Sequence, residues 1–240
     1  MSFIITVLAV AVFVVAVFFI FWFFVTKTKN KGKRPIENKK KPQNKEQELR
    51  NALKTIEKNP RDPHALFVIA ENKFERSEWK QAFKYYELLA EIPNTKGEFD
   101  PVLVNMRASV CASNQNLPDD AFKYIVVAHA LAPSNFDVTF QLGSIEFQRK
   151  NYEKAVQFLQ QAYSLNASSA PVMRLLGHSY FKLKKTREAM AYIHKAIDLM
   201  PDDKESLFTL AECYEESAQI DQALRIYTHL RPDPVWGAQA

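Results

Sequence analysis

Hydrophobic and small residues recur along this chain with a period of 34 residues, from about residue 63 to the C-terminus. Gly143 and Gly177 are 34 residues apart, and so are Ala155 and Ala189. A fixed period of this length is typical of repeat proteins, whose units cannot bury their apolar faces alone and stack on one another. The pattern therefore predicts a solenoid of repeated units.

The spacing inside one unit predicts two helices. In the unit that starts at Ala170, Leu176, Gly177 and Tyr180 share one side of a helix, because residues three and four apart lie on the same face. Small residues such as Ala189 let a second helix approach closely. A proline after the second helix marks its end, since proline cannot continue the hydrogen-bond ladder.

This combination of residues resembles the tetratricopeptide repeat (TPR) family. The residues that carry the likeness in one unit are Leu176, Gly177, Tyr180, Ala189, Ile193, Ala196 and Pro201. The resemblance covers residues 46–231 and implies an all-α, TPR-type helical-hairpin solenoid of about five repeats. We expect the repeats at residues 63–94, 102–135, 136–169, 170–203 and 204–231, a lone helix before them at 46–58, and a C-terminal tail at 232–240.

The N-terminal segment has a different character. Residues 3–25 carry no charged side chain and are dominated by Phe, Val and Ile. As a helix this segment would be about 34 Å long at about 1.5 Å per residue, enough to cross a hydrocarbon core of about 30 Å. A cleaved signal peptide is the alternative, but it would have a basic start and a small-residue cleavage site. We therefore expect a transmembrane helix at residues 3–25.

A basic segment follows the apolar one. Between Lys27 and Lys45 there are nine Lys or Arg residues and one acidic residue, Glu37. This composition predicts a disordered linker at residues 26–45. The linker either binds anionic lipid head groups or serves only as a topology signal and stalk.

Basic flanks stay in the cytoplasm. We therefore expect a single-pass protein of a bacterial inner membrane. Its N-terminus would lie outside and its TPR domain in the cytoplasm. The alternative is a TPR domain exported to the periplasm.

Net charge and candidate chemistry argue against several function classes. The whole chain carries a net charge of +5, but the linker supplies +8, which leaves 23 basic and 26 acidic residues elsewhere. The domain thus lacks the basic face of a nucleic-acid-binding protein. Cys111, Cys213 and the five histidines have no metal-ligand spacing. We predict no enzyme activity, no cofactor, no metal and no small-molecule substrate.

Recognition of another protein is the function that remains. In the TPR family the first helix of each pair lines the concave side, which implies a partner-binding groove here. Its expected residues are Phe67, Met106, Arg107, Val110, Phe140, Gln141, Phe147, Arg174, Leu175, His178, Phe181 and Phe208. Such an apolar row suits an amphipathic helix or an apolar peptide segment. Two alternatives stay open: residues such as Phe147 and Phe181 pack inward between repeats, or the C-terminal tail covers the groove.

The sequence does not carry the two-carboxylate clamp with which some TPR proteins hold acidic C-termini. Of the clamp positions in the first three repeats, only Arg107 is basic. We expect a membrane-anchored scaffold or adaptor that assembles a membrane-associated complex, such as secretion, flagellar or envelope-biogenesis machinery. The alternatives are a chaperone-like protein or import receptor that binds apolar client segments in the groove, and a regulatory subunit that recruits a protease or synthase.

Overall fold

The computed structural model describes residues 42–94, 97–233 and 235–236, and in these residues the secondary structure is entirely α-helical. The helices are α2 (Pro42–Lys58), α3 (Pro63–Glu75), α4 (Trp79–Ala90), α5 (Pro101–Ser113), α6 (Pro118–Leu131), α7 (Phe136–Gln148), α8 (Tyr152–Leu165), α9 (Ala170–Lys182), α10 (Thr186–Leu199), α11 (Lys204–Glu216) and α12 (Ile220–Leu230). The prediction of an all-α helical solenoid is confirmed.

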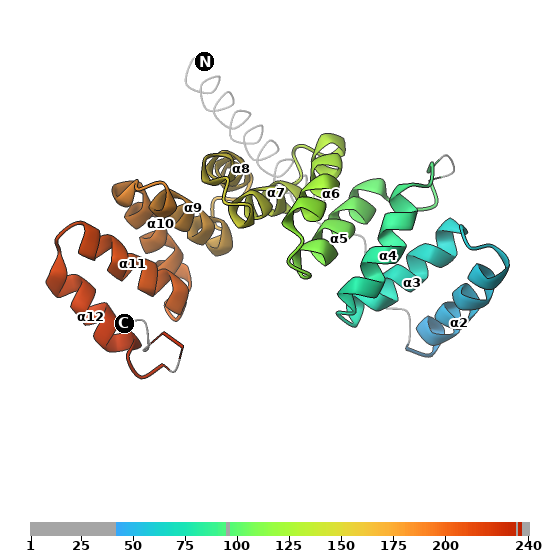
Figure 1. The fold of residues 1–240 in the computed structure, drawn as a ribbon, viewed down its shortest axis with the longest axis horizontal. Helices are drawn as coiled ribbons and strands as arrows, with labels where there is room; N and C mark the ends of the chain where they lie inside the picture. The colour runs from blue at the N-terminus through green and yellow to red at the C-terminus, as the bar shows by residue number, and fades with distance from the viewer. Residues whose placement is uncertain (1–41, 95–96, 234, 237–240) are drawn as a thin grey trace, which may run out of the picture. The chain divides into compact units, whose positions relative to one another are not determined.

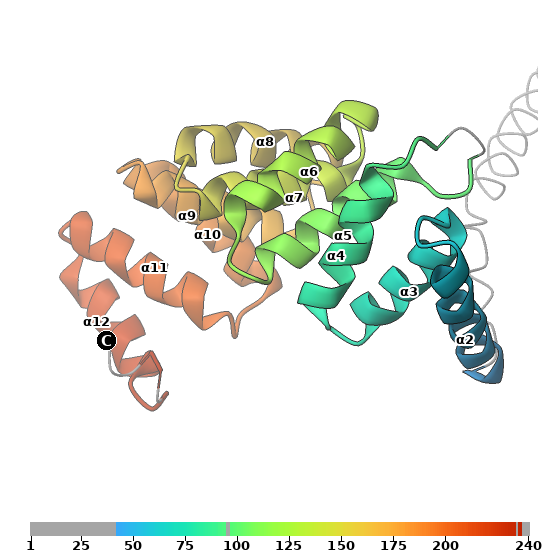
Figure 2. The same cartoon turned by 45° about the vertical axis from the view of Figure 1, so that its right-hand side comes forward.

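Residues 46–240 form a compact unit of their own. Within it each helix packs chiefly on the helices next to it in sequence, and Figures 1 and 2 show the pairs following one another in chain order. Five pairs, α3–α4, α5–α6, α7–α8, α9–α10 and α11–α12, follow the lone helix α2. Odd-numbered helices are the first helices of their pairs, and even-numbered ones the second.

The expected transmembrane helix at 3–25 lies outside the described residues, as does most of the expected linker. None of the helices in the described part has both the length and the apolar character needed to span a bilayer. The last residues of the expected linker are helical, because α2 begins at Pro42 and not at residue 46. Proline is well suited to the first turn of a helix, where its missing N–H has no partner to lose.

The same turn joins the two helices of every pair. One non-glycine residue in each turn has a positive φ, between 57° and 62°: Ser77, Asn116, Lys150, Lys184 and Ala218. The following residue donates its N–H to a carbonyl five residues back, as from Lys185 to Tyr180 at 2.9 Å. This bond satisfies a carbonyl at the end of the first helix. The repeated turn gives the five pairs a common hairpin geometry.

Glycine lets two helices meet closely in the third and fourth pairs. A Cβ atom placed on Gly177 would lie 2.5 Å from both Cγ1 and Cδ1 of Ile193 on α10. On Gly143 it would lie 2.8 Å from Cγ of Leu159 on α8. These distances are far below van der Waals contact, so a side chain at either position would force the two helices or the facing side chain to move.

A histidine is buried in the fourth pair. His178 on α9 is 5% exposed. Its Nδ1 lies 3.4 Å from Oε1 of Glu205, and its Nε2 has no hydrogen-bond partner. Burial, and then the nearby Arg174 guanidinium, lower the pKa of His178 to about 4. The ring is therefore neutral at pH 7.

We expect Gly177→Leu to destabilise the protein by about 1–3 kcal/mol, because the added side chain overlaps Ile193. Damage should reach the neighbouring pairs, since solenoid stability depends on contacts between adjacent repeats. Denaturant unfolding of the full-length chain measures the change. Ala191→Leu on the exposed side of α10 is the control for added apolar volume. Equal stability of the two variants would contradict the close packing at Gly177.

His178 should make the stability of the fold depend on pH. The unfolded chain binds a proton near pH 6.5 and the folded chain only near pH 4, so stability should fall as the pH falls through this window. Between pH 7.5 and pH 5 the wild type should lose about 2 kcal/mol more than His178→Gln. Denaturant unfolding at both pH values measures this difference. His64→Gln, at an exposed histidine, is the control variant for the same pair of measurements.

Candidate protein-docking site

The twelve predicted groove residues all lie on first helices, but the structure does not expose them equally. Ten are half-buried: Phe67, Met106, Arg107, Val110, Phe140, Gln141, Phe147, Arg174, Leu175 and Phe208. We call these ten residues the first-helix face. Side chains in this state can contact a partner while still contributing to the packing of their own repeat.

His178 and Phe181 differ from the expectation of an exposed groove. Phe181 is 8% exposed and belongs to the same core cluster as Tyr180 and Cys213. One turn away on α9, His178 is buried against α11. Both therefore lie in the interior, where the fifth pair covers the fourth. The burial of Phe181 agrees with the alternative in which Phe147 and Phe181 pack inward between repeats.

At the first and second pairs, the first-helix face is built around Arg107 on α5. Its guanidinium carbon lies 4.0 Å from the centre of the Phe74 ring, and its Nε lies 3.6 Å from Oε1 of Glu71. Glu71 also accepts a hydrogen bond from the Tyr86 hydroxyl. Burial, and then this hydrogen bond, raise the pKa of Tyr86. Arg107 is thus held in place between Phe74 and Glu71.

At the third pair the first-helix face is aromatic and amide-rich. The rings of Phe136 and Phe140 on α7 are stacked, with their centres 6.1 Å apart and their planes at 4°. Gln141 reaches back to α5, where its Nε2 donates to Oγ of Ser109 at 3.1 Å. These contacts fix the side chains of α7 next to those of the preceding repeat.

At the fourth pair Arg174 on α9 connects to α11. Its Nη1 lies 2.9 Å from Oε2 of Glu205 and 3.8 Å from Oδ1 of Asp203. Its Nε, like that of Arg107, is buried and has no hydrogen-bond partner.

The C-terminal tail covers part of the fifth pair. The ring centre of Phe208 lies 5.5 Å from that of Trp236 in the tail and 5.7 Å from that of Tyr227 on α12. Asp233 holds the tail in this position, since its carboxylate accepts the N–H of Trp236 at 2.9 Å and pairs with Lys204. The alternative in which the tail covers the groove therefore applies to Phe208. The repeat pattern does not predict the contact of Trp236, because residues 232–240 lie beyond the last repeat. The tryptophan in this short tail is the one sequence signal for it.

The metal-ligand residues and the cysteines of the described part of the chain are candidates for chemistry in the sequence. No cluster of His, Cys, Asp and Glu there could hold a metal ion. Cys111 and Cys213 are free and buried, and burial raises the pKa of each thiol to about 12. Thiols with so high a pKa are poor nucleophiles at neutral pH.

Two family models match the chain. The model described as tetratricopeptide repeat matches residues 180–234, and the model for anaphase-promoting complex, cyclosome, subunit 3 matches residues 110–196. The chain is 31% identical over 99 residues to anaphase-promoting complex subunit 6 of Arabidopsis thaliana, over 39% of this chain and 18% of that protein. It is 27% identical over 103 residues to the peroxisomal targeting signal receptor of Kluyveromyces lactis, over 40% of this chain and 18% of the receptor. The chain thus spans about a fifth of the length of these relatives.

Solved structures show the same fold at low sequence identity. MamA from Desulfovibrio magneticus is 19% identical with a TM-score of 0.63, over 70% of this chain and 93% of MamA. YrrB, described as a TPR protein with an unusual peptide-binding site, is 17% identical with a TM-score of 0.63, over 78% of this chain and 96% of YrrB. Together with the family models, these likenesses confirm the sequence resemblance: the described helices form an all-α solenoid of TPR repeats.

Proposed function

We propose that this protein is a membrane-anchored TPR scaffold that binds partner proteins through its first-helix face. The observation that carries the proposal is that ten side chains from successive first helices are half-buried, and nine of them lie outside the part that Trp236 covers. A row of such residues from repeat to repeat offers one continuous set of contacts to an elongated ligand. Secretion, flagellar or envelope-biogenesis machinery are complexes in which a scaffold of this kind would serve.

The chemistry of the face favours a peptide segment as its ligand. Phe67, Val110 and Phe140 supply apolar contact, and the half-buried side chains of Arg107 and Arg174 supply positive charge beside them. An amphipathic helix or an extended apolar segment can contact both kinds of group. The peptide-binding site in the description of YrrB and the likeness to a targeting-signal receptor support the same class of ligand.

Membrane anchoring is part of the proposal and rests on the sequence of residues 1–45. The uncharged segment 3–25 would serve as the anchor, and the basic linker would contact anionic lipid and keep the repeats on the cytoplasmic side.

A chaperone-like protein or import receptor that holds apolar client segments is the second candidate. The apolar first-helix residues of the second and third pairs, Met106, Val110 and Phe140, favour it. A holder of clients would bind many apolar peptides with similar affinity, whereas a scaffold would bind one or two stable partners.

Phe67→Ala combined with Phe140→Ala should lower the affinity for the partner at least ten-fold. Aromatic anchors commonly contribute more than about 1 kcal/mol each, and about 1.4 kcal/mol corresponds to one decade in affinity. The partner is first identified by mass spectrometry of proteins that co-purify with the full-length chain, and calorimetry then gives the dissociation constant. Tyr163→Ala, at a half-buried ring on the second helix α8, is the control. A double variant that binds normally but melts at a lower temperature would assign these rings to the core.

Protease treatment of intact cells should leave residues 46–240 undigested, because the basic linker favours a cytoplasmic location for them. The same treatment after permeabilisation should digest the domain. An antibody against the C-terminal residues reports both results on a blot, with a known cytoplasmic protein as the control. Digestion before permeabilisation would reverse the topology, and a mature form without residues 1–25 would establish a cleaved signal instead.

A further inference from the structure

The second helix of one repeat makes a polar contact with a tyrosine of the next repeat at three of the four junctions between the five pairs. The contact is made by the fifth residue after the small alanine of the second helix, at Glu87, Gln160 and His194. Glu87 accepts a hydrogen bond from the Tyr124 hydroxyl at 3.1 Å. Gln160 donates to the Tyr180 hydroxyl at 2.6 Å, and Nε2 of His194 lies 3.2 Å from the Tyr214 hydroxyl.

The junction between the second and third pairs is built differently. The corresponding residue on α6 is Val126, which cannot hydrogen-bond. Phe158 on α8 faces Val126. It occupies the repeat position that is Tyr124 in the preceding repeat and Tyr192 in the following one. Glu146 on α7 takes the place of Tyr180 and Tyr214. It is buried, and its Oε2 is paired within its own repeat with Arg149 at 3.2 Å and Asn151 at 2.7 Å.

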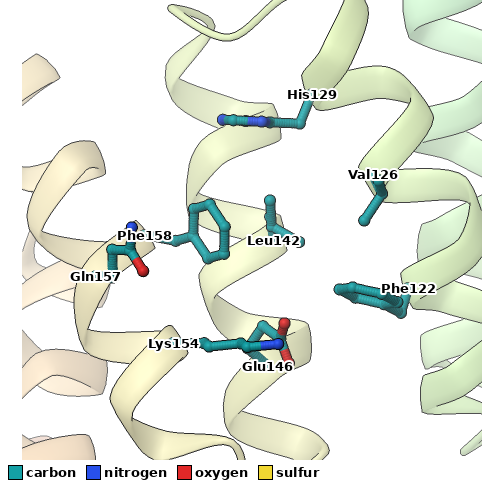
Figure 3. Close-up of a pocket in the computed structure, with 8 residues that line it drawn as sticks. All are labelled: Phe122, Val126, His129, Leu142, Glu146, Lys154, Gln157 and Phe158. Atoms are coloured by element: carbon teal, nitrogen blue, oxygen red, sulfur yellow. The ribbon is translucent and has the colours of Figure 1, made fainter.

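A hollow of about 230 Å³ lies at this junction. Figure 3 shows apolar side chains in its middle, His129 at one end, and Lys154 with Glu146 at the other. The lining residues are Phe122, Val126, His129, Leu142, Glu146, Lys154, Gln157 and Phe158, from α6, α7 and α8. The hollow thus lies at the junction that lacks the tyrosine contact of the other three, although Arg149 pairs with Asp119 across it at 2.9 Å.

Apolar surface continues from the hollow along α6. Val126, Val127 and Leu131 are 40%, 45% and 53% exposed. The corresponding residues of α8, except for Leu165, are glutamines. Exposed apolar side chains that surround a hollow are typical of a surface that another protein covers.

The polar groups at the two ends of the hollow indicate which polar groups a partner would need. Lys154 is exposed, and its ammonium has no ion-pair partner among the described residues. Glu146 does not supply an open negative charge, because Arg149 and Asn151 already bind its carboxylate. At the other end, Nε2 of His129 is buried without a hydrogen-bond partner while its ring packs against Phe158. An apolar group with a carboxylate beside it would complement this arrangement.

We propose that the hollow between α6 and α8 is a second protein-docking site, which takes an apolar side chain of an acidic amphipathic helix from a partner protein. The apolar anchor lies against Phe122, Val126 and Phe158, and a carboxylate of the same helix pairs with Lys154. This site lies between α6 and α8 over α7, and none of its lining residues belongs to the first-helix face. Variants of its own residues therefore distinguish it from that face.

The test uses three fluorescent helical peptides of equal length and the purified full-length chain. The acidic peptide has two leucines four residues apart with flanking glutamates, the basic peptide has lysines in place of the glutamates, and the third has alanines in place of the leucines. Fluorescence anisotropy, with the detergent buffer alone as the blank, gives their affinities. The acidic peptide should bind at least ten-fold more tightly than either of the others. Equal binding of the acidic and basic peptides would overturn the proposal.

Two variants locate the binding. Val126→Gln with Phe158→Tyr introduces a polar pair like that of Glu87 and Tyr124 at the first junction and adds polar atoms to the hollow. The acidic peptide should therefore lose at least ten-fold in affinity while the melting temperature is kept. Lys154→Glu, a surface change, should weaken the acidic peptide and strengthen the basic one. Lys80→Glu on α4 is its matched control and should change neither. Unchanged peptide binding in both site variants would overturn the proposal. So would self-association of the wild type that the double variant abolishes, or binding to anionic vesicles that Lys154→Glu abolishes.

Discussion

The close contact between the two helices of each pair is the constraint on which the rest of this structure depends. At Gly177 and Gly143 the facing side chain of the second helix lies where a Cβ atom would otherwise be. The turn that joins the helices has one residue with a positive φ in every pair, although that residue is not glycine in any of them. Such backbone is unfavourable for a side-chain-bearing residue. It persists because the packed helices on both sides determine it.

This constraint also decides which residues are available for function. Small residues at the contact between paired helices leave little room for variation in the interior of a repeat. Variation is possible on the outer sides of the helices and at the junctions between repeats. The half-buried side chains of the first helices and the hollow between α6 and α8 lie in these two places.

Much of the fold could be predicted from the sequence, because the 34-residue period and the spacing of apolar residues report directly on helix faces. The burial of Phe181 and His178 could not, because the period shows which face of a helix a residue occupies but not how far the next repeat covers it. The early start of α2 at Pro42 was obscured by the basic composition of the preceding segment. The contact between Trp236 and Phe208 depends on a turn in which Asp233 accepts the N–H of Trp236. This turn has no counterpart in the repeats, so the 34-residue period does not predict it.

Departures from the repeat carry more information about function than the repeat itself. The shared residues at each junction secure stacking, and a side chain that hydrogen-bonds across the junction, such as Gln160 to Tyr180, adds to it. Replacement of this contact by Val126 and Phe158 removes a stabilising interaction and leaves apolar atoms facing a hollow. An unfilled apolar hollow costs stability in the free protein. A partner side chain that fills the hollow removes this cost in stability in the complex but not in the free protein. This difference between the free and bound states favours binding, and a perfectly regular solenoid would lack it.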